Sequence, residues 1–192
     1  MASLVLTGDT SGQVTIAAPA VAGTNTLTLP ALTGTVLTNK TAGTLLQVVN
    51  ANLTSAASTA STTAVTTGLT ATITPTSSTS KIFVIVNGIG SHSEAGGNQG
   101  LFRIVRNIPS SNTVVDNQAT SSTYGVTAAV VEGQRTRNPV DFSLYDSPAT
   151  TSAITYTLQF YTSGGGTVYL GRWGTNADFL QSTNLTLLEI AA

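Results

Sequence analysis

The residues of this chain that could take part in acid–base or nucleophilic chemistry are few. His92 is the only histidine, and it lies in the sequence SHSEAGG with Glu94 two positions later. A Ser–His–acid triad also needs a positioned nucleophile, but the chain has no cysteine and no G-x-S-x-G motif that would mark one. One histidine without cysteine also disfavours a zinc site. We therefore expect His92 to be a solvated histidine in a loop.

The eight acidic residues lie in no recognisable catalytic motif. They are Asp9, Glu94, Asp116, Glu132, Asp141, Asp146, Asp178 and Glu189. Glycan hydrolysis requires two carboxyl groups that face each other across a sugar, and no spacing in this sequence marks such a pair. A glycan-cleaving enzyme that uses an acid such as Asp141 is therefore the weakest of the functions considered. The sequence predicts no enzyme, no catalytic residue, no cofactor and no metal.

Three further features could bind a ligand, and each also has a structural explanation. A small basic cluster consists of Arg103, Arg106, Arg135 and Arg137. Because guanidinium groups suit partly buried ion pairs, we expect these arginines to form salt bridges between subunits and not a phosphate site. The glycines at 164–166 would bind phosphate only before a helix, and a strand pattern follows them, so they predict a hairpin turn. Trp173 is expected in the core or an interface, and an exposed tryptophan would instead suggest a carbohydrate platform.

The composition indicates an all-β protein that associates. Charged residues make up 8% of the 192 residues, against about 25% in ordinary proteins. Threonine (36) and serine (19) together outnumber the seven Lys plus Arg and eight Asp plus Glu, and threonine suits a pleated surface. The net charge of −1 excludes a basic field for nucleic acid, and no apolar run reaches the ~20 residues of a membrane span. A low charge favours association over solubility.

The hydrophobic pattern predicts about ten short strands in a body formed by residues 41–192. Their expected ranges are 41–50, 68–76, 81–86, 101–106, 113–115, 124–132, 140–144, 153–160, 167–170 and 185–190. The strand at 68–76 is expected at a sheet edge because it ends at Pro75. The strand KIFVIV at 81–86 is expected at a sheet centre with both faces buried. Residues 51–67 and 87–100 are expected to be loops.

Residues 1–40 are expected to form a separate N-terminal arm with two similar halves. In the first half, Leu4-x-Leu6 is followed by Gly12-x-Val14; in the second, Leu27-x-Leu29 is followed by Gly34-x-Val36. Each half alternates apolar and polar residues around a glycine, which predicts a strand, a turn and a strand. Since an isolated hairpin is marginal in water, the arm needs a partner surface. The expected interface residues are Leu4, Leu6, Val14, Ile16, Leu27, Leu29, Val36 and Leu37.

Residues 3–38 resemble the N-terminal segment of tail-fibre and virion decoration proteins of bacteriophages. The more specific part of the resemblance is NTLTLP at 25–30 followed by GTVLT at 34–38. The later sequences ITP at 73–75, SKI at 80–82 and LTLLEI at 185–190 are similar to the β-sandwich heads of such proteins. The resemblance implies a β-rich, homotrimeric and non-enzymatic virion protein, but does not separate a capsid decoration protein from a tail fibre.

The expected fold is therefore an all-β, antiparallel, jelly-roll-like β-sandwich head (residues 41–192) preceded by an extended β-hairpin arm (residues 1–40) for attachment and trimerisation. The compact head, with no repeat shaft or coiled-coil heptads, favours a capsid decoration protein (cement protein or head fibre) that binds the major capsid protein and stabilises the head. The alternative is a short tail fibre or receptor-binding tip whose partners are tail or baseplate proteins or a host surface glycan. In either case we expect synthesis in the host cytoplasm and a place on the outer surface of the virion.

Overall fold

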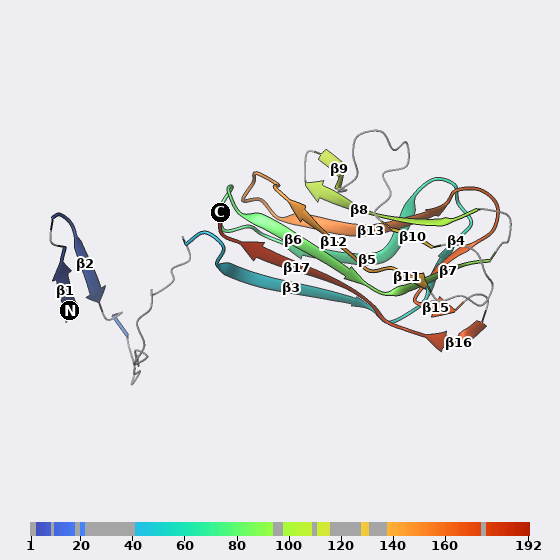
Figure 1. Ribbon diagram of the computed structural model, residues 1–192, viewed down its shortest axis with the longest axis horizontal. Coiled ribbons are helices and arrows are strands. Elements are labelled where there is room, and N and C mark those ends of the chain that lie inside the picture. Colours follow the sequence, from blue (N-terminus) through green and yellow to red (C-terminus); the bar gives the residue numbers. More distant parts are fainter. Residues whose placement is uncertain are drawn as a thin grey trace. The chain divides into compact units, whose positions relative to one another are not determined.

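The computed structural model describes residues 3–8, 10–17, 20–21, 41–93, 98–108, 111–115, 128–130, 138–173 and 176–192 (Figure 1). The chain divides into two compact units, Met1–Val36 and Leu37–Ala192. The N-terminal unit contains an antiparallel hairpin of β1 (Ser3–Thr7) and β2 (Gln13–Ala17). The turn closes through a hydrogen bond from the Gly8 amide to the Gly12 carbonyl, and Gly12 has a φ of +84° that favours glycine. The first half of the arm thus has the predicted hairpin.

The second unit, which we call the body, is built from short strands, and no helix occurs among the described residues. Its strands are β3 (Leu45–Leu53), β4 (Ala57–Thr59), β5 (Val65–Ile73), β6 (Lys81–Asn87), β7 (Ile89–His92), β8 (Gly100–Ile108), β9 (Ser111–Val115), β10 (Ala128–Val130), β11 (Asn138–Pro139), β12 (Phe142–Asp146), β13 (Ile154–Thr162), β14 (Val168–Leu170), β15 (Arg172–Trp173), β16 (Asn176–Leu180) and β17 (Thr183–Ile190). The predicted all-β class is therefore confirmed.

Two antiparallel layers form the sandwich. One layer has the strand order β12-β6-β17-β3, and the short sheet β11-β7-β14-β4 continues it, since β7 follows β6 after Gly88 and β11 leads into β12. The other layer has the order β10-β8-β13-β5, with β9 added beside β8. A small ribbon of β15 and β16 lies between β14 and β17 in the chain.

The eight principal strands pair as a jelly roll. The first pairs with the last (β3 with β17), the second with the seventh (β5 with β13), the third with the sixth (β6 with β12) and the fourth with the fifth (β8 with β10). The chain therefore runs as one long nested hairpin that is wound into two sheets, as the jelly-roll prediction requires.

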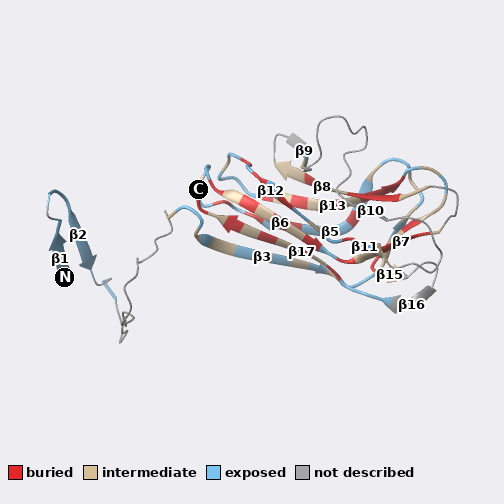
Figure 2. Ribbon diagram, viewed as in Figure 1, coloured by how far each residue is buried: buried red, intermediate tan, exposed pale blue. Residues whose placement is uncertain are grey.

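The body contains its own hydrophobic core between the two layers. Alternate residues of the long strands point inward, so that β6 and β17 each show a strict alternation of buried and half-buried positions (Figure 2). The core residues are Leu69, Ala71, Ile73, Ile82, Val84, Val86, Phe102, Ile104, Val140, Leu144, Ile154, Tyr156, Leu158, Phe160, Val168, Leu170, Leu185 and Leu187. All of them belong to the body, which therefore needs no help from the hairpin to bury apolar area.

Three details of the sequence prediction were wrong. The stretch 51–67 is not a plain loop, because β3 continues to Leu53, β4 follows and β5 begins at Val65. The stretch 87–100 contains β7, which pairs with β11 and β14 and is mostly buried. β6 is central as predicted, but only one of its faces is buried, because the second layer covers the sheet on one side. β5 lies at a sheet edge, as predicted.

Candidate attachment site

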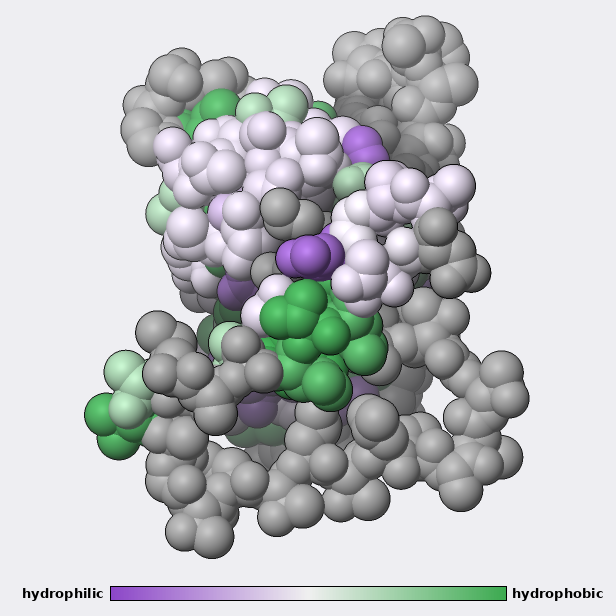
Figure 3. All heavy atoms as spheres, turned by 90° about the vertical axis from the view of Figure 1, so that its left-hand side faces the viewer, coloured by the Kyte–Doolittle hydropathy of each residue, from purple (hydrophilic) through white to green (hydrophobic). Residues whose placement is uncertain are grey.

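The β1–β2 hairpin presents four aliphatic side chains on one face. Leu4 lies opposite Ile16 and Leu6 lies opposite Val14 in the antiparallel register. Residues two apart on a strand share a face, so these four side chains form one patch, which we call the aliphatic face of the hairpin. They are 51–63% exposed. Figure 3 shows the hydrophobic side chains of this hairpin as one green patch.

The opposite face of the hairpin is more polar. It carries Val5 and Thr15 as a directly opposed pair, and Thr7 lies opposite Gln13. The hairpin therefore has one apolar and one mixed face, which is the pattern of a ribbon that packs on a surface. The structure brings Leu4, Leu6, Val14 and Ile16 together as predicted from the sequence. The other four predicted interface residues, Leu27, Leu29, Val36 and Leu37, lie outside the described residues.

His92 is not the solvated loop residue that we expected. It ends β7, is fully buried, and pairs with Val168 of β14. Its Nε2 lies 3.0 Å from Oγ1 of Thr162. The Thr162 hydroxyl also lies within hydrogen-bond distance of the Gly164 and Gly165 carbonyls. His92 therefore supports the turn at 163–166. The prediction of a hairpin turn there was wrong, because the strands that the turn joins, β13 and β14, belong to different sheets and do not pair with each other. Glu94 lies outside the described residues.

Asp146 occupies a buried ion pair between the two layers. Its Oδ1 accepts a hydrogen bond of 2.6 Å from Nη1 of Arg106, and its Oδ2 accepts one of 2.7 Å from the Tyr156 hydroxyl. Burial raises the pKa of Tyr156, and the hydrogen bond to Asp146 and its negative charge raise it further. The tyrosine therefore stays neutral and donates to the carboxylate. Both carboxylate oxygens are paired, although the buried Nε of Arg106 has no hydrogen-bond partner, and the cluster joins the two sheets.

Glu189 is a second buried carboxylate, located on the inner side of β17. Its Oε1 accepts hydrogen bonds from the Thr76 amide (2.7 Å) and hydroxyl (2.8 Å), and its Oε2 accepts one from Nε2 of Gln47. Burial alone would raise the pKa of Glu189, but these donors and the nearby Ser80 hydroxyl outweigh it and lower the pKa. Ser80 acts through proximity, because its Oγ makes no hydrogen bond of good geometry. The carboxylate fastens the 76–80 turn to the sheet.

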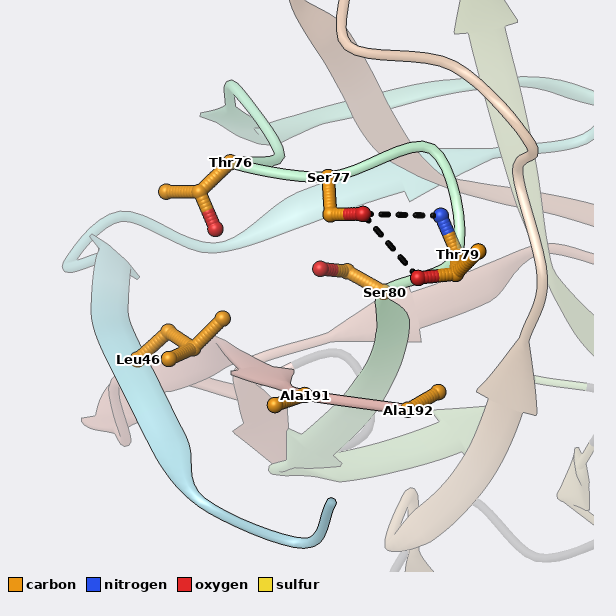
Figure 4. A pocket seen from close by; sticks show the side chains of 7 residues that line it. All are labelled: Leu46, Thr76, Ser77, Thr79, Ser80, Ala191 and Ala192. Atoms are coloured by element: carbon orange, nitrogen blue, oxygen red, sulfur yellow. Dashed lines mark hydrogen bonds between the residues drawn. The ribbon is translucent and has the colours of Figure 1, made fainter. Parts of the chain in front are cut away.

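A pocket of about 410 Å³ lies beside this turn. Figure 4 shows that it is lined by Leu46, Thr76, Ser77, Thr79, Ser80, Ala191 and Ala192. Two of its hydroxyl-bearing residues are engaged locally, since Oγ of Ser77 accepts from the Thr79 amide and lies 3.0 Å from Oγ1 of Thr79. The lining has no charged side chain, and it offers hydrogen bonds but no nucleophile–base pair.

A second pocket, of about 400 Å³, lies where β6 turns into β7. Its lining is polar and consists of Asn87, Gly88, Ile89, Pro139, Asp141, Gln181, Ser182 and Asn184. Asp141 is the acid named above for glycan cleavage, and its Oδ1 accepts a hydrogen bond of 2.9 Å from the Gly88 amide. Asp141 is the only carboxylate in this lining, whereas glycoside hydrolysis needs two.

The remaining predicted features occupy structural positions where the structure describes them. Nε of Arg103 donates to Oε1 of Gln159 on the neighbouring strand, and Arg106 pairs within the chain and not between subunits. Arg135 and Arg137 lie outside the described residues, as do Asp9, Asp116 and Glu132; Trp173 belongs to β15, and its side chain is not described. Within the described ranges, no three His, Asp or Glu side chains form a metal-binding group. The same ranges hold no helix long and apolar enough to cross a membrane.

No protein-family model matches the chain, and a search of curated proteins finds no similar sequence. The solved structures that show a weak likeness to the chain include those of infectious bursal disease virus Gt strain and Gx strain. Their TM-scores are both 0.40, with 17% and 16% sequence identity over 97% and 99% of this chain. The matches cover 46% and 47% of those chains, so this chain spans about half their length. A likeness at this level carries no functional argument, and the proposals below rest on the residues of this chain.

Proposed function

We propose that the chain is a structural protein of a bacteriophage virion, and specifically a capsid decoration protein that binds the capsid exterior through its N-terminal arm. One observation carries the proposal: the hairpin exposes the aliphatic face of Leu4, Leu6, Val14 and Ile16, while the body already has a complete core. The hairpin therefore presents an apolar surface that no described part of the chain covers. The resemblance of residues 3–38 to the arms of phage virion proteins supports the same assignment.

The aliphatic face supplies enough free energy for attachment only when several arms act together. Full burial of a Val, Leu or Ile side chain contributes about 1.5–3 kcal/mol. Because the four side chains are already about half buried, covering them adds roughly 3–6 kcal/mol per arm at that rate. A single arm would thus bind weakly, whereas three arms of a homotrimer would bind by avidity. This supports a trimer that links neighbouring capsid subunits.

Deletion of residues 1–38 tests the proposal. The truncated body keeps every core residue, so it should retain its β-sheet circular dichroism but no longer co-sediment with capsids built from the major capsid protein of the same genome. The full chain should co-sediment and raise the temperature at which those capsids break open. Normal decoration by the truncated protein would show that the arm is not the attachment element.

The second candidate function is a short tail fibre or receptor-binding tip that recognises a host surface glycan. It is favoured by the pocket at the end of β6, whose amide and carboxylate groups (Asn87, Asp141, Gln181 and Asn184) are of the kind that hydrogen-bond sugar hydroxyls. Under this function the purified protein would block adsorption of phage to host cells, whereas a decoration protein would leave adsorption unchanged. Release of sugar products from host polysaccharide would instead indicate an enzyme.

A further inference from the structure

The outer face of the sheet β12-β6-β17-β3 carries a row of apolar side chains in direct register. Tyr145 lies opposite Phe83, Phe83 lies opposite Leu188, and Leu188 lies opposite Val48. The row therefore crosses all four strands. The rings of Phe83 and Tyr145 are in contact, with 5.3 Å between their centroids. At the two edges of the sheet Val48 and Tyr145 are 56% and 53% exposed.

The neighbouring rows of side chains show that the polarity of this face changes along the strands. Toward the start of β3, Ile190 lies between Leu45 and Lys81; toward the other end, Thr186 lies between Asn50 and Ile85, and Asn184 between Asn52 and Asn87. The apolar half of the face is thus the half that contains Leu45, the first residue of β3. We call the set Leu45, Val48, Phe83, Tyr145, Leu188 and Ile190 the apolar sheet face.

The outer face of the opposite layer has a different composition. There Thr72 and Thr155 join their hydroxyls at 2.8 Å, and the Thr157 hydroxyl donates to Asn107. Arg103 and Gln159 form a further polar pair on the same face. The same face also carries Val105, Leu101 and Tyr161, which are only 4–5% exposed. The apolar side chains of that face are thus buried within the chain, whereas Val48 and Tyr145 of the apolar sheet face are more than half exposed.

We propose that the apolar sheet face packs against the body of a second copy of this chain. This proposal extends the proposed function, because it assigns the surface through which copies of the body associate. The sequence KIFVIV of β6 is apolar at every position after its lysine, as in a strand buried on both sides, yet the chain covers only its inner side. The outer side therefore needs a partner that the chain itself does not supply.

Charge selects the kind of partner. Among the described residues of the sheet, Lys81 is the one charged side chain on this face, and its Nζ already donates to Oγ of Ser147. Apart from Lys81 the face offers no charge to a charged partner, whereas a second copy presents the same nearly uncharged surface. A whole chain with 8% charged residues has the composition that such an interface requires, since interface cores are depleted of charge.

The size of the face shows that it does not act alone. Four strands spaced about 4.8 Å apart and seven residues of about 3.3 Å each give a whole outer face of roughly 19 by 23 Å, or about 440 Å², of which the apolar sheet face is about half. A stable complex buries about 800 Å² per partner. Association through the bodies therefore supplies at most about half of a stable interface, and the arms must contribute the remainder.

Lysine substitutions in the edge strands of the full chain test this interface. If they weaken the association, the average mass in solution falls toward that of the monomer. Val48→Lys and Tyr145→Lys place a charge on the apolar sheet face at exposed positions, so the fold should persist in circular dichroism. The matched control is Thr70→Lys, an exposed β-branched residue of the nine-residue edge strand β5. Light scattering over a concentration series should show an oligomer for the parent chain, at least a tenfold weaker association for both variants, and an unchanged association for Thr70→Lys.

Cross-linking between cysteine variants shows which part of a neighbouring chain covers the apolar sheet face. The chain has no cysteine, so Val48→Cys, Tyr145→Cys and Leu6→Cys each introduce a unique thiol. Mixtures are treated with a short bismaleimide. Cross-links between Val48→Cys and either itself or Tyr145→Cys support the proposal. A dominant cross-link between Val48→Cys and Leu6→Cys would show that a hairpin covers the face, and would overturn it.

The remaining outcomes also decide the question. A parent chain that is monomeric at every concentration, an equal loss of association in Thr70→Lys, or no cross-link at Val48→Cys would each overturn the body interface. None of these results would affect attachment by the hairpin, which is read separately by co-sedimentation with capsids. Conversely, a parent chain that forms oligomers but does not bind capsids would refute the proposed function. It would leave the interface between the bodies unaffected.

Discussion

Arg106 on β8 and Asp146 on β12 join the two layers of the sandwich through one ion pair, with 2.6 Å between Nη1 and Oδ1. Both side chains are largely buried, and Tyr156, directly opposite Arg106 on β13, donates to the second carboxylate oxygen. The pair therefore connects strands that share no backbone ladder. Polar interactions hold the two layers together at this point, and apolar packing holds them together elsewhere.

We expect Arg106→Met to destabilise the body by about 3 kcal/mol, because it leaves the Asp146 carboxylate buried without its counter-charge. Urea denaturation followed by circular dichroism measures the change. The double variant Arg106→Met/Asp146→Leu should regain part of the loss, since it removes both charges. Tyr156→Phe should cost less, about 1.5 kcal/mol, as expected for one hydrogen bond to a charged group. If Arg106→Met or Tyr156→Phe were as stable as the parent, the corresponding contact to Asp146 would not contribute to the stability of the body.

Glu189 predicts a loss of stability in acid. Its pKa in the folded chain is lower than its ordinary value, so the unfolded chain takes up the proton first as pH falls. The contribution of this group is therefore complete above the ordinary glutamate pKa and disappears as pH falls through the lowered pKa of the folded state. Urea midpoints measured from pH 7 to pH 3 should decrease over that interval.

The matched variant Glu189→Gln separates this group from other acids. It should be less stable than the parent at pH 7, because Thr76 and Gln47 lose a charged acceptor. The difference between the two proteins should shrink as pH falls. A constant difference at every pH would contradict the assignment.

Two glycines with positive φ should respond differently to alanine. Gly68 has a φ of +90° and open space where a Cβ would lie, so Gly68→Ala should cost only the backbone strain, about 1–2 kcal/mol. Gly171 has a φ of +72°, and a Cβ there would lie 2.8 Å from the Gln181 carbonyl oxygen. Gly171→Ala should therefore be the more destabilising variant in thermal melts, and the reverse order would refute this explanation.

The two faces of the hairpin predict a clear difference in capsid binding. Leu6→Lys charges the aliphatic face, whereas Val5→Lys charges the opposite face at a comparable exposure of 46% against 52%. We expect Leu6→Lys to reduce co-sedimentation with capsids at least tenfold and Val5→Lys to leave it nearly unchanged. Equal effects of the two variants would mean that the aliphatic face does not contact the capsid.

Local hydrophobic patterns predicted the positions of the strands better than they predicted which strands pair. The alternation at Ile154–Phe160 and Val140–Leu144 placed β13 and β12 correctly to within a few residues, because one face of each is buried. The nested pairing of β3 with β17 joins residues at opposite ends of the body, and no local pattern specifies it. The sequence prediction named a jelly-roll-like sandwich from the number and length of the strands, and the pairing supplies the physical basis for that class.

The candidate sites were harder to predict than the strands. The hairpin residues were found because alternation without a core is visible in the sequence. His92 was misplaced because glycine and serine around it suggested a loop, although small side chains also allow a strand to pack closely under its neighbours. The apolar sheet face was missed as a surface. Its signal was the unbroken apolar run of β6, which we interpreted as burial within one chain.

The nested pairing also orders events during synthesis on the ribosome. The β1–β2 hairpin and β3 are made before β6, but β3 and β6 both pair with β17, which follows all the other strands of the body in the chain. The sheet that carries the apolar face is therefore incomplete until the final strand has left the exit tunnel. A nascent chain therefore exposes the aliphatic face of its hairpin before the body can fold, and the apolar sheet face exists only after β17 has been made.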